Sequence, residues 1–165
     1  MATNVLNLTK VENQAILTDV TEYNLSEQIR GCILLLEDKW EKKNLDLQPD
    51  FGEYTIHANE ELLKQVWINL LDNAIKFAPA GHTVEVGITE LETALTVSIA
   101  NTGSEIAPEH QKKIFNKFYQ ADESHAAKGN GVGLAIVKRI TQLHGGEVAV
   151  TSGNEVTTFI VTLPK

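Results

Sequence analysis

The feature that most constrains the fold is a helical pattern over residues 60–78. On a helical wheel with about 100° per residue, apolar side chains cover a wide arc of this segment. Asn59 precedes it as an N-cap, and Pro79 ends it. A helix with so much apolar surface is largely buried, so the rest of the chain must cover it. The arc comprises Leu63, Val66, Trp67, Leu70, Leu71, Ala74, Ile75 and Phe77.

The remaining patterns predict a sheet and two more helices. Apolar side chains at helical spacing mark residues 26–43, behind a capping signal formed by Asn24 and Glu27. The same spacing marks residues 132–144, which end at Gly145. We therefore expect an α+β fold, a two-layer sandwich in which about three helices cover one face of a mixed, mostly antiparallel sheet. Alternating apolar residues predict its strands around 45–47, 54–56, 84–88, 95–99, 148–150 and 159–163, the last four forming two hairpins.

Length and composition limit the class of protein. The chain has 165 residues, enough for one domain with a sizeable core. Its formal net charge of −8 opposes binding to nucleic acid or to an anionic membrane surface. The longest apolar run, 32–36, is far shorter than a membrane span, and Cys32 is the only cysteine. We expect a cytoplasmic chain that contacts neither nucleic acid nor membrane directly.

Two segments lie outside these regular elements. Residues 3–20 carry apolar side chains at loose helical spacing, which favours the end of a truncated helix. We therefore divide the chain into residues 1–22, a helix remnant with a linker, and residues 23–165, the domain. Residues 101–130 are mostly irregular, with a short helix that begins at Pro108. So long a loop in a compact domain is typical of a ligand lid.

A polar strip borders the apolar arc of the 60–78 helix. Asn69 and Asn73 lie one turn apart on it, and Lys76 follows on the next turn. Amide oxygens are hard ligands that suit Mg²⁺, and an ammonium group can meet a phosphate charge. The alternative is an amide pair beside a solvated lysine, and these three residues taken alone favour that alternative.

Glycines mark a second candidate site. Gly129, Gly131 and Gly133 lie where the long loop enters the 132–144 helix. Backbone N–H groups at a helix N-terminus can take phosphate oxygens. The spacing matches neither a Walker loop nor the dinucleotide-binding fingerprint, and a hinge without a ligand is the alternative.

A third candidate site follows the 95–99 strand. Asn101 can present a hydrogen-bonding group at the end of this strand, beside the bare backbone of Gly103. An ordinary turn built on asparagine and glycine is the alternative.

Five motifs in this order resemble those of one family. The chain resembles the catalytic, ATP-binding domain of bacterial sensor histidine kinases, a branch of the superfamily that includes gyrase, chaperone and mismatch-repair ATPases. The resemblance covers about residues 24–164, and residues 3–20 resemble the end of the preceding dimerisation and phosphoacceptor helix. The motifs are Asn69-Leu-Leu-Asp-Asn-Ala-Ile-Lys-Phe77, Asn101-Thr-Gly103, Ile114-Phe-Asn-Lys-Phe-Tyr119, Gly129-Asn-Gly-Val-Gly-Leu-Ala-Ile-Val-Lys138 and His144-Gly-Gly146.

The resemblance implies roles for individual residues. Asn73 is expected to ligate Mg²⁺ with Asn69 beside it, and Lys76 to contact phosphate. Asn101 stands where many relatives have an aspartate that accepts a hydrogen bond from the adenine amino group. An amide oxygen can accept that bond, but without the charge that strengthens it. The other residues expected to contact the nucleotide are Phe77, Gly103, Ile106, Tyr119, Lys128, Gly129, Gly131, Val132, Gly133, Leu134 and Thr157.

The resemblance also implies the reaction. Related ATP hydrolases carry a glutamate at the position of Asn69, where it acts as general base toward water. Because an amide cannot take a proton, this chain is expected to transfer the γ-phosphoryl group of Mg-ATP to a histidine, with Asn69, Asn73 and Lys76 as catalytic residues. The family's acceptor histidine is usually followed by an acidic residue, and none of the five histidines is. We therefore expect the acceptor to lie N-terminal to Met1.

Partners and two alternatives follow from the same resemblance. The implied partners are ATP or ADP, a histidine-containing dimerisation domain of the same protein and a response regulator, and we expect the fragment itself to be monomeric. One alternative is a serine kinase of the anti-sigma type, which shares the nucleotide-binding fold. The other is an interaction domain that has lost nucleotide binding, for which Asn101 and Glu105 are the best support.

Overall fold

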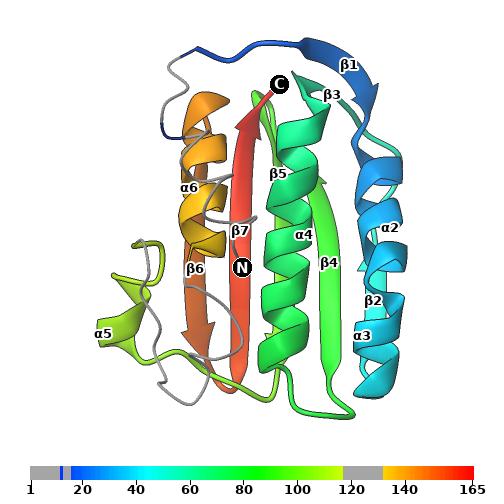
Figure 1. Cartoon of the computed structure of the whole chain (residues 1–165), viewed down its shortest axis with the longest axis vertical. Coiled ribbons are helices and arrows are strands. Elements are labelled where there is room, and N and C mark those ends of the chain that lie inside the picture. The colour runs from blue at the N-terminus through cyan, green and yellow to red at the C-terminus, as the bar shows by residue number, and fades with distance from the viewer. Residues whose placement is uncertain (1–11, 13–15, 117–131) are drawn as a thin grey trace.

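The structure, a computed structural model, describes residues 12, 16–116 and 132–165. It has two layers, with helices lying over one face of a sheet (Figure 1). Within these ranges no helix combines the length and the apolar character that crossing a membrane requires. The elements in chain order are β1 (Val20–Asn24), α2 (Leu25–Leu35), α3 (Glu37–Lys42), β2 (Asp46–Asp50), β3 (Thr55–Asn59), α4 (Glu60–Phe77), β4 (Thr83–Glu90), β5 (Ala94–Thr102), α5 (Pro108–Gln111), α6 (Gly133–Leu143), β6 (Glu147–Gly153) and β7 (Val156–Pro164).

The larger sheet has five strands in the order β2-β4-β5-β7-β6. β2 pairs with β4 in parallel, and the other three pairs of this sheet are antiparallel. β1 and β3 form a separate antiparallel pair. Both predicted hairpins are present as β4–β5 and β6–β7, and the predicted α+β sandwich with a mixed, mostly antiparallel sheet is confirmed.

Helix α4 is the centre of the helical layer, between α2 and α6 (Figure 1). Its apolar arc is buried as the sequence predicts except at Phe77, which is exposed at the end of the helix, and Trp67 and Leu70 are fully inaccessible. The central strands β5 and β7 bury alternate residues toward this layer, among them Val97 and Phe159. Each side chain of this size contributes about 1.5–3 kcal/mol on burial, so the packing of α4 on the sheet contributes substantially to stability.

The helix predicted over 26–43 is divided in the structure. α2 ends at Leu35, and α3 begins at Glu37 after Leu36 adopts φ −100° and ψ 10°. The Leu36 side chain at this break is buried. The Trp40 indole N–H donates to the Ile33 carbonyl over 3.0 Å, which satisfies an acceptor at the end of α2. The helix is therefore interrupted at Leu36 although the apolar spacing continues through it.

Strand β1 was not predicted. Its first three residues are exposed, and only Tyr23 and Asn24 are partly buried, so the segment carries little apolar alternation. Its hydrogen bonds go to β3, with Val20 opposite Asn59. The predicted helix remnant over residues 3–20 lies mostly outside the described residues.

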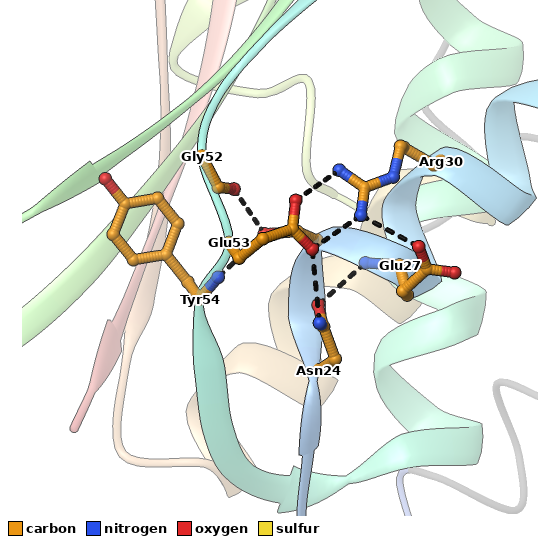
Figure 2. Close-up of polar contacts among 7 residues, drawn as sticks. Asn24, Glu27, Arg30, Gly52, Glu53 and Tyr54 are labelled. Carbon is orange, nitrogen blue, oxygen red and sulfur yellow. Dashed lines mark hydrogen bonds and ion pairs between the residues drawn. The ribbon is translucent and has the colours of Figure 1, made fainter.

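A polar network fixes the start of α2 (Figure 2). The Asn24 side chain caps the helix by accepting from the Glu27 N–H over 2.9 Å, as the capping signal predicts. The Arg30 guanidinium contacts Glu27 at 2.9 Å and Glu53 at 2.7 Å. Hydrogen bonds from Arg30 and Asn24 lower the pKa of the Glu53 carboxyl. The network ties the loop before β3 to α2.

Candidate functional site

Helix α4 carries the first group of candidate residues on one side. The Asn59 side chain caps it by accepting from the Leu62 N–H over 3.0 Å, which fixes where the helix begins. Asn69, Asn73 and Lys76 are partly buried, in contrast to the apolar arc. The helix therefore holds two amides and one ammonium group along a single partly accessible strip.

Asn69 lies directly against the start of α6. Its amide N–H donates to the Gln65 carbonyl over 2.9 Å. Its Oδ1 is 3.0 Å from the place that a Cβ on Gly133 would occupy. A side chain at Gly133 would press on the Asn69 amide and displace it slightly, so glycine suits this close approach. The structure thus brings the asparagine motif and the last glycine of the glycine motif together.

The N-terminus of α6 suits an anionic ligand on chemical grounds. Val132 is the N-cap residue and is fully buried, and it has no side-chain group that could cap the helix. The first N–H groups of a helix have no partner within it, and the helix dipole favours an anion there. Phosphate oxygens are suitable partners for such a terminus, and Asn69 stands beside it.

Asn101 is buried at the end of β5. Its side chain is 1% exposed, and the amide N–H donates to Ser104 Oγ over 2.8 Å. In the sheet register it lies opposite Thr157 of β7, which is also buried. Thr157 Oγ1 donates to the Ser104 carbonyl over 3.1 Å. Two residues of the predicted site, Asn101 and Thr157, are therefore linked through Ser104.

The Ser152 hydroxyl extends the hydrogen-bonded group of Asn101, Ser104 and Thr157. Ser152 Oγ lies 2.9 Å from Thr157 Oγ1 and accepts from the Ile106 N–H over 2.8 Å. Ile106 is another residue expected in the nucleotide site, and these bonds fix its backbone. No sequence pattern identifies Ser104 or Ser152, because their contacts depend on the register of β6, β7 and the loop after β5.

Gly103 has the conformation and the surroundings that require glycine. Its φ is +88°, and a Cβ there would lie 2.7 Å from Pro79 Cδ and from His82 Nδ1. Its N–H donates to the Glu155 carbonyl over 2.8 Å. The turn after β5 is therefore packed against the segment that follows α4, which places the Asn101 motif near the C-terminal end of that helix.

The C-terminal end of α4 has a cap that the sequence analysis missed. Lys43 Nζ donates to the Ile75 carbonyl over 2.8 Å and to the Lys76 carbonyl over 3.0 Å. A cation there opposes the partial negative charge of the helix end. Phe77, the last residue of α4, is 38% exposed. The turn that carries Lys76 and Phe77 is thus held by a residue from the end of α3.

Some of the remaining predicted residues lie in the described part of the chain, and others lie outside it. Gly133 and Leu134 begin α6, with Leu134 partly buried against the core. Phe115 packs edge-on against Phe159, with ring centroids 6.0 Å apart. The candidates that lie outside the described residues are Tyr119, Lys128, Gly129 and Gly131.

The donor chemistry fits Mg²⁺ better than a transition metal. Residues 16–116 and 132–165 contain no cluster of three or more histidine, cysteine or acidic side chains that could hold a metal ion. Asn69 and Asn73 offer neutral amide oxygens on one strip of α4. Mg²⁺ is commonly held by few protein oxygens together with water and substrate phosphates, and these residues suit that arrangement.

Comparison with known proteins gives a consistent family. The model described as "Histidine kinase-, DNA gyrase B-, and HSP90-like ATPase" matches residues 58–165. The sensor histidine kinase CusS of Escherichia coli is 32% identical over 166 residues, covering 99% of this chain and 35% of CusS. The heme sensor protein HssS of Staphylococcus aureus is 32% identical over 165 residues, covering 99% of this chain and 36% of HssS. The chain thus spans little more than a third of these curated relatives.

Solved structures agree with the fold. The nucleotide-free catalytic domain of histidine kinase ThkA has a TM-score of 0.82 at 31% identity, covering 90% of this chain and 97% of that one. Full-length ShkA in complex with AMPPNP has a TM-score of 0.87 at 26% identity, covering 98% of this chain and 34% of that one. ThkA in complex with the response regulator protein TrrA has a TM-score of 0.83 at 29% identity, covering 99% of this chain and 47% of that one.

Proposed function

Since this chain belongs to the histidine kinase-, DNA gyrase B- and HSP90-like ATPase family and corresponds to the catalytic, ATP-binding domain of sensor histidine kinases, we propose that it binds Mg-ATP and supplies the γ-phosphoryl group to a histidine outside residues 1–165. The observation that carries this proposal is the contact between Asn69 and Gly133. It joins a strip of metal-binding amides to a helix N-terminus that suits phosphate.

The residues have distinct proposed roles at the phosphate end. Asn73, with Asn69 beside it, holds Mg²⁺ through amide oxygens, and Lys76 contacts a phosphate oxygen. The bound ion neutralises charge on the phosphates. The N–H groups at the start of α6, including that of Gly133, take further phosphate oxygens. Positioning and charge neutralisation of this kind are the main requirements of phosphoryl transfer.

Asn69 also determines which acceptor is favoured. Its amide donates to the Gln65 carbonyl and cannot accept a proton from water. Without a general base at this position, hydrolysis is slow, and a histidine imidazole is the better acceptor. We therefore assign Asn69 to metal binding and not to water activation.

The adenine end is formed by the buried polar group after β5. The Asn101 amide donates its N–H to Ser104, so its Oδ1 points away from Ser104 and can accept from the adenine amino group. Thr157 and Ile106 lie in the same hydrogen-bonded group. Phe77 and Gly103 border it at the C-terminal end of α4.

The partners and the division of the chain are part of this proposal. We assign residues 1–22 to the end of a dimerisation helix with a linker and residues 23–165 to the catalytic domain, although β1 already begins at Val20. The acceptor is a histidine-containing dimerisation domain of the same protein, and a response regulator receives the phosphoryl group, as the ThkA–TrrA complex suggests. The isolated chain is monomeric and works in the cytoplasm.

Calorimetric titration of ATP and ADP with and without Mg²⁺ tests the proposal. We expect Mg²⁺-dependent binding that weakens by about tenfold or more in Asn73→Ala. Asp72→Ala is the matched control, because Asp72 is the preceding residue of α4 and pairs with Lys39 at 2.9 Å. Absence of binding by the folded wild-type chain would contradict the proposal and favour an interaction domain.

A second experiment separates the kinase classes. The named relatives are sensor histidine kinases, which supports a histidine acceptor over a serine acceptor. Incubation with labelled ATP and a separate histidine-containing dimerisation domain should give a phosphoryl group that is labile to acid and stable to base. An acid-stable phosphoserine on the partner would instead indicate the anti-sigma type of kinase.

A further inference from the structure

The amide of Asn101 and the hydroxyl of Ser104 form a buried pair at the end of β5. Asn101 is 1% exposed, and its Nδ2 lies 2.8 Å from Ser104 Oγ. One end of the amide is therefore held by the protein. The amide oxygen lies at the opposite end from Ser104.

Hydrogen bonds to the backbone of Ser104 and of the preceding residue fix the position of Ser104. Its carbonyl accepts from Thr157 Oγ1 over 3.1 Å, and Thr157 Oγ1 lies 2.9 Å from Ser152 Oγ. Immediately before it, Gly103 is locked at φ +88° and donates to the Glu155 carbonyl. These contacts come from two strands and one turn, so the Ser104 hydroxyl stays within reach of Asn101.

The chemistry of this pair differs from that of a carboxylate. A serine hydroxyl can accept from an amide N–H or donate to an amide oxygen. The Asn101 amide can therefore turn by 180° and keep its bond to Ser104, presenting either its oxygen or its N–H₂ group to the base. An aspartate at the same position can present only acceptor oxygens.

We propose that the Asn101–Ser104 pair sets the base selectivity of this site, so that it takes 6-oxopurine nucleotides as well as ATP. The amide oxygen accepts from the 6-amino group of adenine, and the turned amide donates to the 6-carbonyl of hypoxanthine. This inference rests on the proposed function, which places Asn101 at the base. The Ser104 hydroxyl makes both orientations equally satisfied.

The test compares ATP with ITP, whose base carries a carbonyl group in place of the 6-amino group. Calorimetric titration in Mg²⁺ should give dissociation constants within about tenfold of each other for the wild-type chain. Asn101→Asp should raise the preference for ATP over ITP by about tenfold or more, because a carboxylate cannot donate to the 6-carbonyl. The ratio of the two constants is the decisive quantity.

Two serine variants test the role of the Ser104 hydroxyl in nucleotide binding. Ser104→Ala should weaken ATP and ITP by similar factors of about five or more, since either amide orientation then leaves one buried end without its partner. Ser98→Ala in the middle of β5 is the matched control, and we expect it to change neither constant.

The outcomes distinguish this inference from the proposed function. An ATP preference of about a hundredfold in the wild-type chain that Asn101→Asp leaves unchanged would overturn the selectivity role of the pair while keeping ATP binding. A folded wild-type chain that binds neither nucleotide would overturn both.

Discussion

The backbone N–H of Asn59 donates to Nε2 of His144 over 3.1 Å and so joins the start of α4 to the end of α6. The other ring nitrogen, Nδ1, lies 2.9 Å from the Ile140 carbonyl. Nδ1 must therefore carry the proton and Nε2 must be bare, which is the neutral imidazole. Asn59 is also the N-cap of the helix that holds the proposed metal-binding amides, so this contact couples the two helices of the site.

Protonation of His144 should destabilise the fold. Burial lowers the pKa of the imidazole in the folded chain, and the hydrogen bond to the Ile140 carbonyl opposes this shift only partly. The unfolded chain therefore binds the proton more readily, near pH 6.5. The contribution of His144 to stability is complete above about pH 6.5 and is lost as pH falls toward the lower, folded pKa, at no more than about 1.4 kcal/mol per pH unit.

Urea unfolding of the wild-type chain and His144→Gln between pH 5.5 and 7.5 measures this effect. Glutamine can still accept from the Asn59 N–H but does not titrate, so the free energy of unfolding should depend less on pH in the variant. Equal pH dependence in the two proteins would contradict the assigned role of His144.

Gly103→Ala should destabilise the domain and weaken nucleotide binding. The residue has φ +88°, and its Cβ would lie 2.7 Å from both Pro79 and His82. We expect a loss of about 2 kcal/mol or more from strain and displacement of these neighbours. Gly31→Ala is the matched control, because Gly31 lies in α2 and its added Cβ would meet nothing within 4 Å beyond the helix's own backbone, so it should stabilise by about 0.5–1 kcal/mol. Thermal denaturation and ATP titration of both variants provide the measurement.

The sequence predicts those parts of the fold that local patterns specify. Asn24, Asn59 and Gly145 end or begin helices through contacts within a few residues, and all three were identified. β1 was missed because its pairing depends on a distant segment, and the break at Leu36 was missed because the apolar spacing continues through it.

The same distinction holds at the candidate site. The asparagine and glycine motifs are visible as spacings, and the structure adds that Asn69 touches Gly133. Ser104 and Ser152 carry no spacing signal, since their bonds to Asn101, Thr157 and Ile106 arise from strand register and loop geometry. Pairing of this kind is not readable from one sequence.

Cys32 should be unreactive in the folded chain. The side chain is 2% exposed in α2, and burial raises the pKa of the thiol to about 11, although the charge of Lys64 opposes the shift. At pH 8 the thiolate, which is the reactive form, is scarce and inaccessible. A thiol-specific chromogenic disulfide should therefore label the chain promptly in urea and slowly without it. Prompt labelling of the folded chain would show that α2 opens or packs differently.

The final prediction concerns the Lys43 cap at the C-terminal end of α4. Lys43→Met keeps most of the apolar stem but removes the two hydrogen bonds to the Ile75 and Lys76 carbonyls. We expect a loss of about 1–2 kcal/mol in the free energy of unfolding and weaker Mg-ATP binding, because the last turn of α4 then frays at Lys76. Lys42→Met is the control, since Lys42 is exposed at the end of α3 and should change stability by less than about 0.5 kcal/mol.

Comparing Lys43→Met with Lys42→Met separates a local helix cap from a general effect of charge. Removing either lysine changes the net charge equally, so a long-range electrostatic contribution would appear in both variants. A cap acts only through Lys43 and should be measurable by urea unfolding even in high salt, because partly buried contacts are screened less than exposed ones. If Lys42→Met reduced stability and nucleotide affinity as much as Lys43→Met, the cap would not be the cause, and α4 would not depend on α3 for the position of Lys76.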